Sequence, residues 1–244
     1  MFNQRELISQ VAVTAAQMRD IEARIFAAGM PVAALMEKVA TLITHRIEEI
    51  LKQGDNRNIY SPHPLVPPSP HPLVPPSPYP SVGILAGPGH NGGDALVVAR
   101  ELHFRGYQVR VYCPISKLKE LTAQHLQYVR SLGIACDDSV EKLQDCDFLI
   151  DGLFGFGLER DITEPIASAI NQLNQWHKPV FSIDLPSGLH TDTGKVLGVA
   201  VRATYTLCLG LWKLGLLQDQ ALEYVGNAEL IDFDIQYTDV QAVL

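Results

Sequence analysis

The N-terminal part of the chain has apolar residues at helical spacing. They fall on one face of a helix predicted at residues 15–27, and Thr14 is suited to cap its first turn. Gly29 and Pro31 then interrupt the pattern, and a second helix is predicted at about residues 32–51. We therefore expect two helices before any strand.

From residue 82 onward, short apolar runs alternate with amphipathic segments. Such alternation is typical of α/β proteins, in which helices cover both faces of a parallel sheet. We therefore predict a three-layer α/β/α fold with a mostly parallel central sheet, preceded by the N-terminal helices. Strands are predicted at residues 82–86, 108–112, 148–151, 180–184, 203–209 and near 229–233, and helices at 94–105, 119–131, 165–175 and 212–218.

A proline-rich segment separates these two parts. Residues 61–68 read SPHPLVPP, and the same eight residues recur at 69–76. Prolines at this density remove backbone donors and fix φ, so we expect polyproline II or disorder rather than a helix or a central strand. We interpret about 61–80 as a surface insertion within a single domain spanning 1–244. Its PxxP pattern leaves open a groove-binding role on a partner.

Composition narrows the functional classes. The chain has 244 residues, of which 47% are hydrophobic and 19% charged, and a formal net charge of −8, which argues against a nucleic-acid partner. Its four cysteines form no CxxC pair, so we expect reduced thiols. We find no apolar signal at the N-terminus and no run of about 18 apolar residues. We therefore expect a cytoplasmic protein without a membrane partner.

The turn after the first predicted strand carries the strongest chemical signal. It reads GPGHNGGD at 87–94, so its backbone can approach a ligand while the next helix directs free N–H groups at the same place. This pattern predicts binding of a phosphorylated, nucleotide-like ligand. It also fits GxGxxG, but the next strand ends without the acid that a dinucleotide-dependent dehydrogenase uses for ribose, which makes hydride transfer the weaker reading.

Carboxylates follow two further strands. Asp151 and Asp184 each end an apolar run, and with Asp94 they should meet at the carboxyl edge of the sheet. A single aspartate there could merely cap a turn. Three together suit acid–base chemistry or a bound cation. Arg160 could meet a phosphate, while the absence of GxSxG around Ser187 and of a Walker A motif disfavours acyl and ATP-driven phosphoryl transfer.

Several motifs in sequence order resemble the NAD(P)H-hydrate epimerase family, also called the YjeF N-terminal domain family. The motifs are TAAQMRD at 14–20, LME at 35–37, GPGHNGGD, DGLFGFGL, DLPSGLHTDTG and the KLGL of 213–216. The chain departs from the family at two places: the usual NNGGDG reads HNGGDA at 90–95, and the usual LMENAG reads LMEKVA at 35–40.

The resemblance implies a Rossmann-like fold and an isomerase that interconverts the R and S epimers of hydrated NADH or NADPH. It implies one potassium ion per subunit, with Asn91, Asp151 and Ser187 as ligands. The implied substrate contacts are His90, Asn91, Gly92, Gly93, Asp94, Gly155, Phe156, Gly157, Leu158, Glu159, Arg160, Asp161 and Asp184.

The implied reaction agrees with the residues. Protonating the hydroxyl of a hemiaminal carbon lets the ring nitrogen expel it, and water can then return to the other face of a planar iminium; transient ring opening is the alternative. Either route needs a positioned acid–base group. Asp184 is the first candidate and Asp161 the second. The family also implies a homodimer and pairing with a dehydratase that acts on the same hydrates, while scaffold relatives with this fold leave open a non-catalytic binding module.

Overall fold

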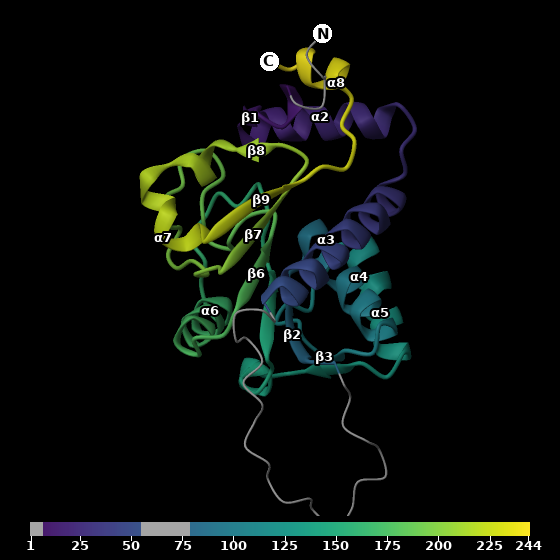
Figure 1. Ribbon diagram of the computed structural model, residues 1–244, viewed down its shortest axis with the longest axis vertical. Coiled ribbons are helices and arrows are strands. Elements are labelled where there is room, and N and C mark those ends of the chain that lie inside the picture. The colour runs from purple at the N-terminus through teal and green to yellow at the C-terminus, as the bar shows by residue number, and fades with distance from the viewer. Residues whose placement is uncertain (1–6, 55–78) are drawn as a thin grey trace, which may run out of the picture.

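The computed structural model describes residues 7–54 and 79–244, arranged around one seven-stranded sheet (Figure 1). Its strand order is β4-β3-β2-β5-β6-β7-β9, and every ladder in it is parallel. This confirms the predicted Rossmann-like sheet. The strands are β2 (Ser81–Ala86), β3 (Gln108–Tyr112), β4 (Ala135–Asp137), β5 (Phe148–Gly152), β6 (Val180–Ile183), β7 (Tyr205–Leu209) and β9 (Asn227–Ile231).

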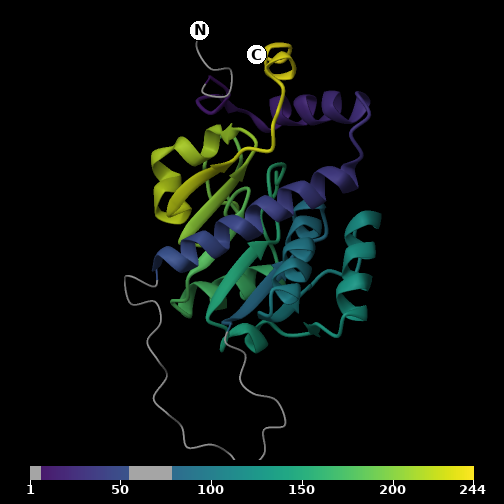
Figure 2. The ribbon, with the colours of Figure 1, turned by 45° about the vertical axis from the view of Figure 1, so that its right-hand side comes forward.

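Helices cover both faces of this sheet, as Figures 1 and 2 show. On one face α3 (Val32–Gly54) packs on α4 (His90–Phe104), which packs on α5 (Glu120–Ser131). On the other lie α6 (Ile166–Gln175) and the 3₁₀ helix Val140–Leu143. The central strands β2, β5 and β6 are buried almost throughout, which explains their apolar runs.

The helices at residues 15–27 and 237–241 lie beyond the carboxyl edge of the sheet. Helix α2 (Ala15–Ala27) is capped by Thr14, as predicted. The Thr14 side chain accepts from the N–H of Gln17, and the Gln17 side chain completes a capping box. It contacts α8 (Tyr237–Gln241), while the short helix α7 (Leu222–Val225) precedes β9. Helix α2 thus lies across the edge where the ligand site of such a sheet is expected.

The strand order reverses at β2. From β2 the chain moves outward to β3 and β4, and it then returns to the other side of β2 to form β5, β6, β7 and β9. At such a switch point the connections leave in opposite directions and open a crevice at the carboxyl ends of the strands. The crevice lies between β2 and β5, which carry the two glycine-rich motifs.

The predicted helix at 212–218 is wrong. Its first residues form β8 (Trp212–Lys213), which pairs in parallel with β1 (Ala12–Val13), and a 3₁₀ helix follows at Leu214–Leu217. Local periodicity could not reveal a partner strand about 200 residues away. The short elements β4, α7 and α8 were not predicted either, and the proline-rich repeat at 61–76 lies outside the described residues.

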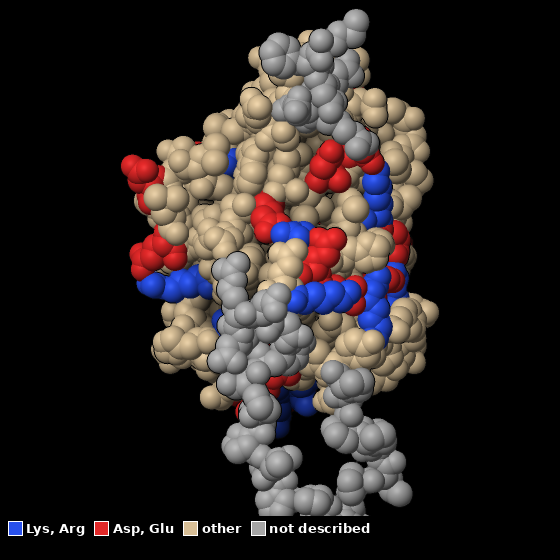
Figure 3. Space-filling view, in the orientation of Figure 1, with Lys and Arg blue, Asp and Glu red and all other residues tan. Residues whose placement is uncertain are grey.

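Within the described ranges, no single helix is long and apolar enough to cross a membrane; α2 and residues 32–53 pass that test only as a pair bent by 118°. The four cysteines are free thiols, two buried and two half-buried. On the face shown in Figure 3, acidic and basic side chains are interspersed rather than gathered by sign.

Candidate active site

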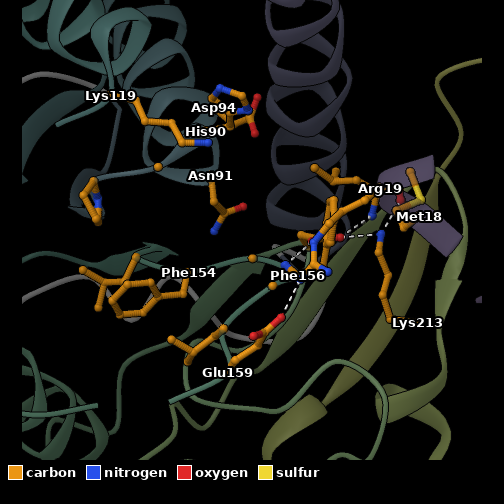
Figure 4. Close-up of a pocket in the computed structure, with 18 of the residues that line it drawn as sticks. Met18, Arg19, His90, Asn91, Asp94, Lys119, Phe154, Phe156, Glu159 and Lys213 are labelled. Carbon is orange, nitrogen blue, oxygen red and sulfur yellow. Dashed lines mark hydrogen bonds and ion pairs between the residues drawn. The ribbon is translucent and has the colours of Figure 1, made fainter. Parts of the chain in front are cut away.

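A cavity of about 1190 Å³ opens at the crevice. This exceeds the roughly 300–1,000 Å³ of most small-molecule sites and is large enough for a dinucleotide. Its walls come from α2 and α3, from the turn before α4, from residues 153–166 after β5, and from Asp184 and Lys213. Figure 4 shows how these side chains converge from separate elements.

The glycine-rich turn after β2 forms one end of the cavity. Helix α4 begins at His90, and its N-cap Gly89 supplies no side-chain acceptor for the first helical N–H groups. These groups carry the positive end of the helix dipole and suit a phosphate. A Cβ on Gly92 would lie 1.9 Å from the carbonyl oxygen of Gly87, so glycine there lets α4 start directly against the strand end.

Basic side chains flank this turn. Lys119, the N-cap residue of α5, lines the cavity beside His90, and Figure 4 shows both at the same end of the site. Burial and the charge of Lys119 lower the pKa of His90, so both disfavour the imidazolium form in the free protein. Arg160 also lines the cavity, and Arg19 from α2 forms an ion pair with Glu159, at 2.9 Å.

The centre of the site is a buried ion pair. The Nζ of Lys213 lies 2.5 Å from Oδ1 of Asp184, and both side chains are almost fully buried. Asp184 also accepts hydrogen bonds from the N–H of Phe156 at 2.9 Å and of Leu209 at 3.3 Å. Its φ of 69° is unusual for a residue other than glycine, and backbone strain of this kind is often found at functional sites.

Two further carboxyls face the same cavity, Asp94 from α4 and Glu22 from α2. Burial, with the charges of Asp184 and Glu22, raises the pKa of Asp94 well above its ordinary value. Burial, and then Asp184, raises the pKa of Glu22 to about 7, against the opposing charges of Lys213 and Lys119. The site thus combines a buried ion pair with two carboxyl groups, Asp94 and Glu22, whose pKa values are raised.

Asp151 and Ser187 lie behind this cavity rather than on its wall. Ser187 donates from Oγ to Oδ1 of Asp151 at 2.6 Å and from its N–H to Oδ2 at 2.9 Å, while Ser182 and the Leu153 N–H complete the set. In the described part of the chain no cationic side chain pairs with Asp151, although the residue is fully buried. The side-chain nitrogen of Asn91 is also buried without a hydrogen-bond partner.

The structure brings most of the predicted substrate contacts together. The cavity is lined by His90, Asn91, Asp94, Asp184 and the whole of residues 155–161. Gly92 and Gly93 do not line it; a Cβ on Gly93 would come within 2.7 Å of Met36, so this glycine serves helix packing. Of the two acid–base candidates, Asp184 is buried and held by donors, whereas Asp161 is exposed.

Sequence reasoning missed Glu22, Lys119 and Lys213 as site residues. Lys213 belongs to the KLGL motif, and a charged residue in such an apolar run is a usable signal for a buried partner. Glu22 follows the TAAQMRD motif, but its position on the cavity side of α2 depends on tertiary packing. Lys119 lies outside every motif that the sequence suggested.

The comparisons with known proteins agree with this geometry. The family described as YjeF-related protein N-terminus matches residues 32–215. The chain belongs to this family. It is 49% identical over 232 residues to the Bifunctional NAD(P)H-hydrate repair enzyme Nnr of Thermosynechococcus vestitus, covering 95% of this chain but only 41% of that protein.

Two further relatives define the extent of the family domain. The NAD(P)H-hydrate epimerase of Limosilactobacillus fermentum is 32% identical over 92% of this chain and 98% of its own length. A crystal structure of the yeast protein ynu0, YNL200c, has a TM-score of 0.67 at 21% identity, covering 84% of this chain and 82% of that one, and shows the same fold.

The two departures from the family motifs have structural explanations. Lys38 does not line the cavity; its Nζ binds the Phe233 carbonyl at 2.9 Å and the Asp234 carboxylate at 2.7 Å, so it secures the C-terminal segment. Ala95 faces Gly152, where any added Cβ would lie 2.3 Å from the alanine methyl. The methyl of Ala95 thus fills space that glycine in β5 leaves open.

Proposed function

We propose that this chain epimerises hydrated NADH or NADPH, interconverting the R and S forms as part of nicotinamide nucleotide repair. The observation that carries the proposal is a single dinucleotide-sized cavity with an anion-binding helix N-terminus at one end and the Asp184–Lys213 pair deep in its wall. Family membership and the epimerase of L. fermentum, which matches over almost its whole length, support it.

The proposed chemistry takes place at the hydrated carbon of the nicotinamide ring. The diphosphate lies at the start of α4, between His90 and Lys119, and the ring reaches the carboxyl cluster. There the buried Asp184 anion faces the cationic iminium that forms when the hydroxyl leaves, and a fixed negative charge in a desolvated site stabilises such a cation. Asp161 remains the alternative carboxylate, although its exposure makes it the weaker electrostatic partner.

A potassium ion beside Asn91, Asp151 and Ser187 is also part of the proposal. The donor set fits a hard monovalent ion, because it consists of oxygen ligands around a buried carboxylate without a cationic partner among the described residues. The unpaired amide of Asn91 fits as well, since a flipped amide would direct its oxygen into the same space. When bound, the ion would supply positive charge that fixes the turn containing Phe154, whose N–H donates to Ser187.

The proposal also covers the cellular compartment, the oligomeric state and a partner activity. We place the chain in the cytoplasm because its four thiols are unpaired, and we expect a homodimer. The chain spans less than half the length of the bifunctional relatives that it matches. We propose that it works with a dehydratase activity acting on the same hydrates.

The direct test mixes the purified protein with the R epimer of hydrated NADPH and follows the S epimer by chromatography. We expect equilibration by the wild type and a rate lower by about 10² or more for Asp184→Asn, with ligand binding retained. Binding without any conversion by the wild type would favour a non-catalytic binding module instead. Near-normal turnover by Asp184→Asn would transfer the catalytic role to Asp161.

A further inference from the structure

Glu22 lies in the active-site cavity without a fixed partner. It sits on α2, one helical turn after Met18, and both residues line the cavity. Within residues 7–54 and 79–244, no donor forms a hydrogen bond with its carboxyl group and no cationic side chain lies within ion-pair distance. Its neighbour Arg19 is instead paired with Glu159. A half-buried carboxyl left free in this way on the cavity wall is available to a ligand.

Asp184 is placed differently. It receives the ammonium group of Lys213 and two backbone N–H groups, and these donors stabilise the anion. Protonating it would leave Lys213, which is fully buried, without its counter-charge. Asp184 is therefore occupied by its ion pair and its backbone donors, whereas the carboxyl of Glu22 is not.

The charged groups around Glu22 come from several elements that line the cavity. Asp184 after β6 disfavours a charge on Glu22, while Lys213 on β8 and Lys119 before α5 favour it. Asp94 on α4 faces the same group, and the charge of Glu22 raises the pKa of Asp94. Burial outweighs the two lysines, and the resulting pKa of about 7 leaves the acid and its conjugate base both populated at neutral pH. That condition is the most favourable one for general acid–base catalysis.

We infer that Glu22 is the residue that carries the proton in the epimerisation, and that Asp184 acts as the fixed anion beside it. The inference rests on the proposed function. In the first step the Glu22 carboxylic acid gives its proton to the ring hydroxyl, the C–O bond breaks, water leaves, and the nitrogen lone pair forms the C=N bond of the iminium.

In the second step water attacks the other face of that carbon. The new C–O bond forms, the C=N electrons return to nitrogen, and the proton that the water loses passes back to the Glu22 carboxylate. No net proton, electron or co-reactant is consumed, and the enzyme ends in the protonation state in which it began.

The test compares Glu22→Gln, Glu22→Asp and the wild type with the R epimer of hydrated NADPH as substrate. We expect kcat to fall about 10²-fold or more in Glu22→Gln and to recover in part in Glu22→Asp, with KM little changed. Wild-type kcat should decline on a limb with an apparent pKa near 7, and Glu22→Gln should lack that limb. A merely structural role for Glu22 would not move the pH profile.

Asp20→Asn is the matched control. It removes one carboxylate from the same helix at an exposed position outside the cavity, and it should keep wild-type turnover. Circular dichroism and melting temperature establish folding for each variant. If the wild type converts the epimers while a folded Glu22→Gln retains the rate and the limb, the inference is overturned and the proposed function stands. If the wild type converts nothing, the proposed function itself fails.

Discussion

The buried pair of Lys213 and Asp184 should contribute to the stability of the fold as well as to the active site. In the variant Lys213→Met a side chain of similar length and volume replaces the ammonium group. Lys213 also donates to the Leu209 carbonyl at 2.5 Å and lies 5.8 Å from the centre of the Phe156 ring. The substitution therefore leaves a desolvated carboxylate with only two neutral donors.

The magnitude follows from the burial of both partners. Removing one member of a buried ion pair costs about 3–5 kcal/mol of unfolding free energy, because the other charge remains out of water. The double variant Lys213→Met with Asp184→Asn no longer contains that charge. It should recover part of the loss, with a coupling energy of about 2 kcal/mol, within the range measured for contacting residues.

The pH range in which Lys213 stabilises the fold follows from its pKa. Burial acts to lower the pKa of Lys213, but the charge of Asp184, with smaller help from Cys208, outweighs burial and raises it. A raised pKa contributes stability that is complete below the unfolded-state value near 10.5 and is lost as pH rises through the folded-state value. The stability that the charge of Lys213 contributes should thus be fully present up to about pH 9 and should be lost at higher pH.

Urea unfolding of the four proteins of this cycle at pH 7.5 measures these quantities. Little sensitivity to salt is expected, since the pair is shielded from solvent. A loss below about 1 kcal/mol for Lys213→Met, or a double variant no more stable than the sum of the single losses, would refute the account of a desolvated and coupled pair.

Three further substitutions probe the cavity and its packing. The affinity of the wild type for ADP-ribose should rise as pH falls below about 7, because a diphosphate favours the imidazolium form of His90, and His90→Asn should weaken this rise. Titration calorimetry from pH 5.5 to 8.5 measures both affinities. Identical pH profiles for the two proteins would show that His90 does not contact the phosphates. Gly155→Ala places a Cβ 2.9 Å from Oδ2 of Asp184 and should lower epimerisation at least tenfold in a protein that still folds, as activity and melting temperature will show. Gly152→Ala should cost about 1–3 kcal/mol by overpacking against Ala95, and adding Ala95→Gly should relieve it in urea unfolding.

The fold could be predicted from the sequence where a segment's own pattern determined its structure. The apolar run of β3 is bounded by Gly106 and Pro114 and was predicted residue for residue, and the capping box at Thr14 fixed the start of α2. The segment at 212–218 failed because its apolar spacing fits a helix as well as a strand. Its partner, β1, has only two residues, too few for any periodicity.

The same distinction between local sequence pattern and tertiary packing applies to the candidate site. Glycines and aspartates at strand ends indicate a ligand crevice, because the topology of a parallel sheet brings those ends together independently of the loop conformations. A helix that crosses the crevice gives no such signal: on the sequence, Glu22 is an ordinary polar position of an amphipathic helix, equivalent to the exposed Asp20 two residues earlier. Only the packing of α2 over the carboxyl edge of the sheet distinguishes the two.

The departures from the family motifs show why a motif comparison needs the surrounding structure. A lysine in place of an amide at position 38 suggests a changed ligand site when the motif is read alone, yet the side chain reaches away from the cavity to a carboxylate and a carbonyl nearly 200 residues later. His90 differs, because it stands at the first turn of α4, within the electrostatic reach of Lys119. A substitution at that position acts on the ligand through charge, so it is His90, and not Lys38, that should give this chain a pH response absent from relatives with asparagine there.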